Sequence, residues 1–535
     1  MEDNLFDGLD EATRKELEKL LQVTREKDGN KAYANAQIDI FRYILEPYEF
    51  GHDKLDNGIF YLRNVKEADG NNYYLAISFI ALTQSILKKN YDENCLLFIR
   101  VLEEGKWSFD VFFNNAFKIA KECLENGDCR NSKKLFSLIG GSYSYQATCY
   151  ERVCELTIKM ETKRIGELSE SLIRKVEEII DILRLDFLPL SEDEQAPERK
   201  LAHYTGTYTT NKLLFKEENK DKASAFRLNT INNVNDPSEG KLLKNYLEDV
   251  KESSFYKPDF DEKLHAFISC FTFNHDSLNQ FRLYGKEDNK EASGVSLVFN
   301  KEFFKETDSQ SSMTNISIDR TIKNVNDDSD EEKGDSSTKR IEKQSVMRCV
   351  YIDPTSDYIH LAQRNRLTFF REFGRENLEG SSTAKAEAEW NEYKKYITEK
   401  TEEFKKAFKE LKEIYRAAIA SKKSLKNVSE EDINEIDSLL DMIILPLKYL
   451  IKHSAFQEEQ ECRMVYITSL KDERVQMDFG KFLYVEYEPE VKANLDKIYI
   501  APAATQYQTY LAKLLCDTDV KIELSNNPFR LPTSH

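Results

Sequence analysis

The spacing of apolar residues changes once along this chain, and that change limits the folds it can adopt. Up to about Leu190, apolar residues recur every three or four positions, which is typical of amphipathic helices. From Leu201 onward, short runs such as "HAFISCFTF" and "CRMVYIT" are instead typical of strands. Prolines and charges without periodicity separate the two parts. We therefore predict an α+β protein with a helical domain at 1–190, a linker at 191–200 and a second domain at 201–535.

Two stretches of the helical part resemble each other. "KNYDENCLLF" and "GDCRNSKKLF" align with an offset of 38 residues, and each joins a short turn to a helix that reaches Leu-Phe. The offset resembles that of tetratricopeptide-like helical hairpins, whose repeat is about 34 residues. Stacked hairpins would form a concave surface for a protein partner, whereas an irregular helical bundle would only support the second domain. The sequence leaves both alternatives open.

Charge and cysteine content narrow the class of protein. The chain has 77 basic and 95 acidic side chains and a formal net charge of -18, so nonspecific attraction to nucleic-acid phosphates or anionic membranes is not its main driving force. No apolar run approaches the roughly 18 residues of a membrane span. The acidic first residues do not form a secretory signal, and the nine cysteines include no CxxC pair. We expect a cytoplasmic protein with reduced thiols and no membrane contact.

Two segments of the second domain are predicted to be insertions. Residues 306–340 are rich in Ser, Asp, Asn and Lys without apolar periodicity, which favours a disordered surface insertion. The alternative is an acidic segment that docks onto a basic groove. Residues 384–453 form a predicted helical insertion, in which a long charged helix precedes a second helix from about Glu430 to His453. Pro446 is expected to kink or interrupt that second helix.

The segment "FQEEQECRMVYIT" crowds Glu458, Glu459 and Glu461 just before a predicted buried strand. Crowded carboxylates cost free energy in a dry site, so they either lie on a solvated turn or point into a cleft. If the strand begins early, alternation puts Glu459, Glu461 and Arg463 on one face. Arg463 would then pair with a carboxylate and lower its pKa, although an ordinary structural ion pair would do the same.

Three other segments combine reactive side chains with strands. His203 lies in the strand-like "AHYTGTY", where a structural hydrogen-bond donor is the simpler interpretation. "FRLNTINNVNDPSEGK" runs from a strand into an Asx turn at 235–237. "FISCFTFNHDSLNQFRLYG" ends a strand and begins a helix near Asp276. Its Cys270 could be the nucleophile of a thiol hydrolase, with His203 or His275 as the base.

Taken in chain order, these segments resemble a known pattern. "HYT", "NDPSEG", "SCF", "FRLYG" and "EQECR" resemble the motifs of a bacterial domain-of-unknown-function family, family 2971. The resemblance covers about Leu201 to Arg530, and the spaced set is more specific than any one motif. The family often has Trp before the Tyr-Gly and before the Glu-x-Glu, where this chain has Phe281 and Phe456. Both departures keep a flat apolar ring.

That family looks like a remote relative of the ADP-ribosyltransferases, which use a His or Arg on a first strand, a Ser or Tyr on a second and a Glu leading into a later strand. The resemblance implies a mixed split β-sandwich domain with helical insertions, and NAD as substrate. It implies that Glu461 stabilises an oxocarbenium-like ribose and that Glu459 positions or deprotonates the acceptor. The residues implied for NAD binding are His203 at the adenosine-side ribose, Tyr204, Thr205, Ser269 in the nicotinamide pocket, Tyr284 as a stacking ring, and Arg463.

The expected activity is transfer of ADP-ribose from NAD to a macromolecule, as a bacterial toxin, effector or antiphage defence protein would perform it. Two alternatives remain: an NAD glycohydrolase on the same fold, and a noncatalytic protein whose helical part binds a partner. A metal-dependent nuclease is disfavoured because no metal-binding set of carboxylates is evident. The acceptor, the trigger, the oligomeric state and the identity of the catalytic glutamate among Glu458, Glu459 and Glu461 stay open.

Overall fold

The computed structural model describes most of the chain. The residues described are 11–45, 59–86, 91–104, 110–140, 143–160, 163–185, 198, 200–216, 223–233, 240–249, 262–305, 340–353, 355–367, 370–371, 382–426, 428–480 and 482–529. The predicted Asx turn at 235–237 and the predicted insertion up to residue 339 lie outside them. Arg340, the last residue of that predicted insertion, begins a strand.

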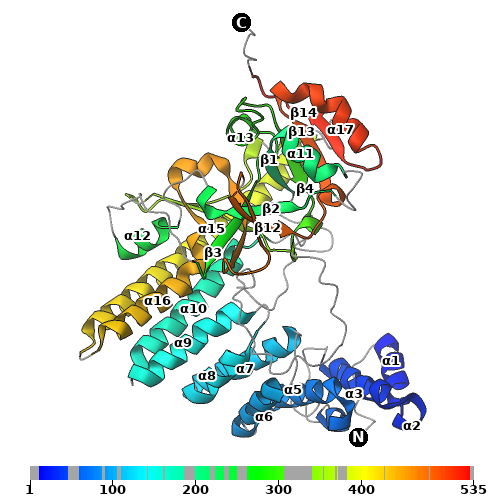
Figure 1. Cartoon of the computed structure of the whole chain (residues 1–535), viewed down its shortest axis with the longest axis vertical. Coiled ribbons are helices and arrows are strands. Elements are labelled where there is room, and N and C mark those ends of the chain that lie inside the picture. The colour runs from blue at the N-terminus through cyan, green and yellow to red at the C-terminus, as the bar shows by residue number, and fades with distance from the viewer. Residues whose placement is uncertain are drawn as a thin grey trace. The chain divides into compact units, whose positions relative to one another are not determined.

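The chain divides between Glu170 and Ser171 into two compact units, which is earlier than the predicted boundary at residue 190. The described part of the N-terminal unit is helical (Figure 1). Its elements are α1 (Glu11–Leu21), α2 (Arg25–Asp28), α3 (Asn30–Leu45), η1 (Glu67–Asp69), α5 (Asn71–Ile86), α6 (Tyr91–Glu104), α7 (Asp110–Glu125), α8 (Cys129–Leu138), α9 (Ser144–Met160) and the first part of α10 (Lys163–Leu183).

Two helical hairpins of this unit correspond to the two similar sequence stretches. Helices α5 and α6 form one hairpin, α7 and α8 form the next, and α5 contacts α7 while α6 contacts α8. The second helices begin at Tyr91 and Cys129, which keeps the offset of the aligned sequences. Asp128 caps α8 by accepting a hydrogen bond from the backbone of Asn131, and the buried Ser132 hydroxyl donates to the Ala120 carbonyl of α7.

The C-terminal unit is a mixed sheet with helices around it. Among the described residues the main sheet has 11 strands. In chain order they are β1 (Leu201–Thr205), β2 (Phe226–Thr230), β3 (His265–Thr272), β4 (Val295–Phe299), β5 (Arg340–Ile341), β6 (Met347–Arg348), β10 (Glu461–Thr468), β11 (Val475–Asp478), β12 (Phe482–Tyr487), β13 (Leu495–Ile500) and β14 (Lys521–Leu524). The β12–β5 and β13–β14 pairs are parallel and the other pairs are antiparallel. The α+β class is therefore confirmed.

Helices and short turns connect these strands. They are α11 (Thr207–Leu214), η3 (Ile231–Asn233), α12 (Leu242–Glu248), α13 (Leu278–Leu283), η4 (Lys301–Phe303), η6 (Lys492–Asn494), η7 (Pro502–Tyr507) and α17 (Gln508–Leu514). An aromatic cluster under the sheet links its strands to η4, and the ring centroids of Phe299 and Phe303 stack at 4.1 Å. Phe226 of β2 and Phe271 of β3 pack into the same cluster.

The main sheet divides at β3. Strand β10 pairs along one whole side of β3, from Glu461 opposite Thr272 to Thr468 opposite His265. On the other side, β1 pairs with β3 at Thr272, whereas β2 pairs with it at Phe267 and Ile268. Within the described strands, residues 269–271 have no partner on that side. Because β1 and β2 separate at this point, backbone and side chains of the middle of β3 face an opening.

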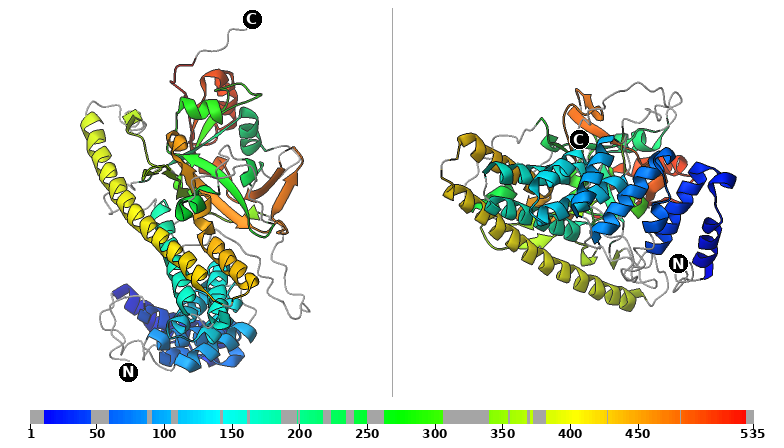
Figure 2. Two further views of the ribbon diagram at one scale, coloured as in Figure 1. Left: turned by 90° about the vertical axis from the view of Figure 1, so that its left-hand side faces the viewer. Right: turned by 90° about the horizontal axis from the view of Figure 1, so that it is seen from below.

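A second, small sheet connects the main sheet to the helical insertion. It contains β7 (Val350–Ile352), β8 (Ile359–Leu361) and β9 (Ile451–His453). The insertion itself is two helices, α15 (Ser382–Ser424) and α16 (Glu430–Lys448), of which α15 is the long yellow helix in Figure 2. Helix α16 continues through Pro446, so an interruption there is wrong, while the alternative of a kink stays a prediction. The helical prediction for 384–453 is also wrong at its end, because residues 451–453 pair with β7 as a strand.

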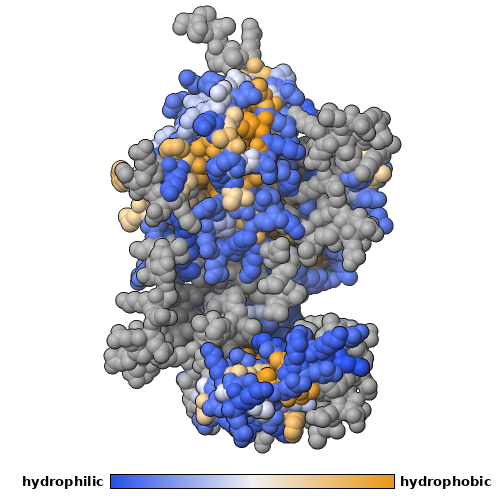
Figure 3. All heavy atoms as spheres, turned by 90° about the vertical axis from the view of Figure 1, so that its right-hand side faces the viewer, coloured by the Kyte–Doolittle hydropathy of each residue, from blue (hydrophilic) through white to orange (hydrophobic). Residues whose placement is uncertain are grey.

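The exterior agrees with the charged composition. Most of the side chains coloured in Figure 3 are hydrophilic, and hydrophobic ones gather in a band in the upper part of the view. None of the helices within the described ranges combines the length and the apolar character needed to cross a membrane.

Candidate functional site

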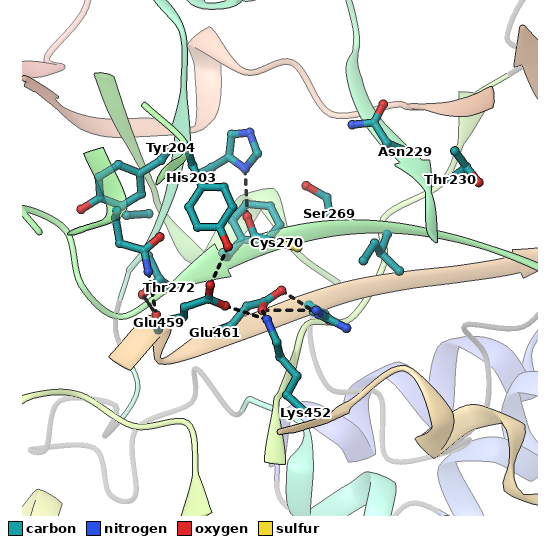
Figure 4. A pocket seen from close by; sticks show the side chains of 16 residues that line it. His203, Tyr204, Asn229, Thr230, Ser269, Cys270, Thr272, Lys452, Glu459 and Glu461 are labelled. Carbon is teal, nitrogen blue, oxygen red and sulfur yellow. Dashed lines mark hydrogen bonds and ion pairs between the residues drawn. The ribbon is translucent and has the colours of Figure 1, made fainter. Parts of the chain in front are cut away.

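A cavity of about 240 Å³ lies where the main sheet divides (Figure 4). Its walls come from β1, β2, β3, α13, the small sheet and the start of β10. The lining residues are Ala202, His203, Tyr204, Asn229, Thr230, Ile268, Ser269, Cys270, Phe271, Thr272, Gln280, Tyr284, Lys452, Glu459, Glu461 and Arg463. Figure 4 shows His203 and Asn229 on either side of Ser269. The division of the sheet therefore brings side chains from segments far apart in sequence around one space.

Glu461 is the first residue of β10 and is buried in this wall. Its backbone N–H donates to the Tyr351 hydroxyl at 2.8 Å, and its carbonyl accepts from Cys349 N–H at 3.0 Å. Its carboxylate accepts from Arg463 Nε at 2.6 Å and from Lys452 Nζ at 2.5 Å. Burial alone would raise the pKa of Glu461, but these two cations outweigh it and lower the pKa below its usual value. Glu461 is therefore a carboxylate at neutral pH.

Glu459 reaches the same wall from a different element than predicted. It ends the 3₁₀ helix η5 (Ser454–Glu459), and Gln460 follows with a left-handed φ of 46°, so strand alternation does not orient it. Its carbonyl accepts hydrogen bonds from Thr272 and Gln280, which fix the end of η5 to β3 and α13. Its Oε1 accepts from the Tyr284 hydroxyl at 2.5 Å. Because Glu459 is buried, the solvated-turn alternative is wrong for this carboxylate and for that of Glu461.

Lys452 lies between the two glutamates. Its Nζ donates to Glu459 Oε2 at 2.6 Å and to Glu461 Oε2 at 2.5 Å. Burial lowers the pKa of Lys452, but the two carboxylates more than compensate and raise it well above its usual value. Figure 4 shows this side chain entering from the small sheet below the two carboxylates. Lys452 was not predicted as a site residue because the sequence around it has a helical pattern.

His203 on β1 faces the middle of β3. Its Nδ1 lies 2.9 Å from the Cys270 carbonyl, which can only accept a hydrogen bond, so Nδ1 carries the proton. Burial lowers the pKa of His203, so the ring is neutral and Nε2 remains a hydrogen-bond acceptor. Burial and the nearby Glu461 raise the pKa of the Cys270 thiol well above its usual value. Since His203 contacts the carbonyl and His275 contacts the Lys200 carbonyl, the geometry does not support a thiol nucleophile at Cys270.

Of the remaining residues that were predicted from the sequence, Ser269 and Tyr204 line the cavity and Thr205 does not. Ser269 is buried against the cavity, and in the part of the chain that the structure describes its hydroxyl has no hydrogen-bond partner. Such a group is expected to bind a ligand or water. Tyr204 lines the cavity, but its hydroxyl donates to the Asn274 carbonyl and accepts from Ser277 N–H, which fixes the loop before α13. Thr205 does not line the cavity and pairs with Val295 of β4.

A second cavity, of about 580 Å³, shares Gln280, Tyr284 and Glu459 with the first. Its other walls include Leu283 at the end of α13, Lys286 after α13 and Phe456 of η5. Small-molecule sites usually measure about 300–1,000 Å³, so the first cavity alone is small for a dinucleotide. Glu459 and Tyr284 form the boundary between the two spaces.

Several cavity residues carried no signal in the sequence. Thr272, Gln280 and Asn229 are ordinary polar residues of strands and helices, and only the three-dimensional pairing around β3 places them at the cavity. Among the described residues no group of three or more His, Cys, Asp or Glu side chains could hold a metal ion. No family model, curated protein or solved structure matches this chain.

Proposed function

We propose that this chain is an NAD-dependent ADP-ribosyltransferase that modifies a macromolecule, with a C-terminal split β-sandwich domain related to family 2971. One observation carries the proposal: His203 on β1, Ser269 on β3 and Glu461 at the start of β10 line one cavity, on strands that are neighbours in the order β1–β3–β10. Along the chain, these residues follow the order His, Ser, Glu that the resemblance to ADP-ribosyltransferases implies.

The charge distribution suits cleavage of the nicotinamide glycosidic bond. When that bond breaks, its electron pair leaves with nicotinamide and positive charge develops on the ribose. The lowered pKa of Glu461 keeps a carboxylate available to stabilise this charge and to accept a hydrogen bond from the ribose 2′-hydroxyl. The bonds from Arg463 and Lys452 fix its orientation beforehand. Fixed charge of this kind lowers the barrier because it needs no reorganisation during the reaction.

The two cavities suit the two halves of the transfer. The first would hold the nicotinamide riboside half, with the Ser269 hydroxyl, which has no partner among the described residues, bonding the carboxamide. At the edge of that space, His203 Nε2 would accept a hydrogen bond from a hydroxyl of the adenosine-side ribose. The second would admit the acceptor, since it opens on the other side of Glu459 and Tyr284. Glu459 would take the acceptor proton as the new glycosidic bond forms. The helical hairpins of the N-terminal unit would recognise a protein partner or trigger.

The test uses the purified chain, labelled NAD and a bacterial lysate. Nicotinamide release and label on macromolecules are followed for the wild type, Glu461→Gln and the control Glu523→Gln. Glu523 is matched because it also pairs with a lysine, Lys497, at 2.8 Å, but does not line the cavity. We expect Glu461→Gln to reduce both signals by about 10²- to 10³-fold with unchanged folding, and Glu523→Gln to retain them.

Each result separates the alternatives. Label that depends on Glu461 establishes transfer. Nicotinamide release without label establishes a glycohydrolase instead. Absence of both signals from the wild type, with or without candidate triggers, would overturn the proposal and favour a noncatalytic protein.

A further inference from the structure

Lys452 occupies an unusual position between two carboxylates. It is 4% exposed, and a single Nζ donates to Oε2 of both Glu459 and Glu461. Those two oxygens therefore lie within roughly 5 Å of each other, a separation at which like charges disfavour simultaneous ionisation. If no cation lay beside them in this buried wall, one of the two carboxyls would stay protonated. The ammonium group removes that conflict.

The surroundings of Lys452 hold it in place. Strand β9 pairs in parallel with β7, which puts Lys452 opposite Tyr351, the residue whose hydroxyl accepts from Glu461 N–H. The ring of Phe456 on η5 lies 5.1 Å from Nζ. The titratable and charged groups that act on Nζ include Glu459 from η5, Glu461 and Arg463 from β10, Cys270 from β3, and Cys349 and Tyr351 from the small-sheet side. Each element that meets at the carboxylates therefore contributes to the position of this lysine.

Arg463 has a narrower role. Its guanidinium bonds the Glu461 carboxylate through Nε at 2.6 Å and the Tyr449 carbonyl through Nη1 at 2.6 Å. Glu459 instead receives its hydrogen bonds from Lys452 and from the neutral Tyr284 hydroxyl. Loss of Lys452 would leave Glu461 paired with Arg463, but it would remove the ion pair between Lys452 and Glu459.

Lys452 itself is unsuited to nucleophilic attack. Its raised pKa keeps it as an ammonium ion, and an ammonium ion has no lone pair for covalent chemistry.

We propose that Lys452 is a positioning residue that keeps Glu459 and Glu461 ionised together and directs both carboxylates to the boundary between the two cavities. This inference deepens the proposed transferase function and rests on it for its catalytic consequence. The ionisation of the two carboxyls can be measured without any reaction.

The first experiment titrates the two carboxyls in the full chain by NMR with isotope-labelled glutamate, assigned with Glu459→Gln and Glu461→Gln. We expect Lys452→Met to raise the pH at which one of the carboxyls titrates by at least about one unit. Lys452→Arg keeps the charge and should leave both close to their wild-type titrations. Lys497→Met removes a lysine from an ion pair away from the cavity and should also leave both unchanged. If Lys452→Met does not fold, Lys452→Gln replaces it, since it keeps a polar side chain without the charge.

The second experiment measures nicotinamide release against pH in the same variants. The acidic limb of the profile should move to higher pH in Lys452→Met by the same amount, with about a tenfold loss at each pH on that limb, and should be restored in Lys452→Arg. If neither carboxyl titration moves in the uncharged variants, the role of Lys452 is overturned, whatever the activity. If the titration moves as expected but wild-type protein releases no nicotinamide, the positioning stands and the proposed transferase function fails.

Discussion

In the described part of the C-terminal unit, two buried ion sites differ in their surroundings. Glu198 and Arg348 form a pair whose side chains are both fully buried, and Arg348 also donates to the Ala362 carbonyl at 2.8 Å and lies 5.2 Å from the Phe273 ring. The second site, Glu459, Glu461, Lys452 and Arg463, lines a cavity. The first has one carboxylate for one guanidinium, whereas the second brings two carboxylates onto one ammonium.

This difference separates a structural from a chemical use of buried charge. The sealed pair joins Glu198, which precedes β1, to Arg348 of strand β6, although Glu198 Oε2 and Arg348 Nε have no hydrogen-bond partner among the described residues. A cavity-lining network instead keeps carboxylate oxygens near a space that a ligand can enter. Burial and ion pairing alone therefore do not mark a functional site, whereas a crowded network beside a cavity is a candidate for one.

The largest expected effect is at the sealed pair. Glu198→Gln leaves the buried guanidinium of Arg348 without its carboxylate, so we expect a loss of about 3–5 kcal/mol in the free energy of unfolding. Denaturant unfolding followed by circular dichroism measures it. Nicotinamide release per folded molecule should stay at the wild-type level; a selective loss of catalysis would contradict the distinction between the two sites.

The same Glu-to-Gln substitution in the cavity network should reduce catalysis more than stability. In Glu461→Gln, Lys452 still donates a hydrogen bond to Glu459, and Arg463 still donates one to the Tyr449 carbonyl. We therefore expect a smaller loss in the free energy of unfolding, of about 1–3 kcal/mol. Catalysis, by contrast, should fall by the factor of about 10²–10³ given above. Parallel denaturation and nicotinamide assays compare the two variants, and equal stability losses would remove the contrast.

Tyr284→Phe tests the neutral member of the cavity network. It removes the 2.5 Å hydrogen bond to Glu459 Oε1 while keeping the ring. We expect label transfer to fall about tenfold, which corresponds to the roughly 1.4 kcal/mol of one hydrogen bond to a charged group. Nicotinamide release should fall less, because Glu461 retains its own partners. A larger fall in release than in transfer would assign Glu459 to bond cleavage instead of to the acceptor.

Acid should reveal the smallest difference. The pKa of Glu461 is lowered in the folded protein from an ordinary 4.5, so its stabilising contribution is complete above pH 4.5 and is lost as the pH falls below it. We therefore expect the free energy of unfolding to fall more steeply below pH 4.5 in the wild type than in Glu461→Gln, by on the order of 1 kcal/mol. Denaturation series at several acidic pH values measure the two slopes, and identical slopes would show that Glu461 gains nothing from its cations.

The sequence predicted the parts of this architecture that local patterns determine. The runs "HAFISCFTF" and "CRMVYIT" became β3 and β10, and helix α13 begins close to the predicted Asp276. His203, Ser269, Glu459, Glu461 and Arg463 were named from their motifs and line one cavity. Residue type and spacing are sufficient where a short motif lies on one strand.

The features that the sequence did not predict depend on distant partners. Strand β9 has three residues and exists because it pairs with β7, which precedes it by the whole helical insertion. Because a helical pattern leads directly into these residues, they were predicted to be helical, and Lys452 was not predicted to be a site residue. The division of the sheet at β3 is likewise invisible locally, since it arises from the registers of β1 and β2 on one edge.

The left-handed backbone at Gln460 predicts how this chain can vary in evolution. Its side chain accepts from Gln363 N–H at 2.7 Å and donates to the Gln457 carbonyl at 2.6 Å, which offsets the cost of a positive φ in a residue other than glycine. Relatives should therefore accept Gly or Asn between the two glutamates but exclude Val, Ile and Thr. Insertions and deletions between Glu459 and Glu461 should be absent from functional descendants.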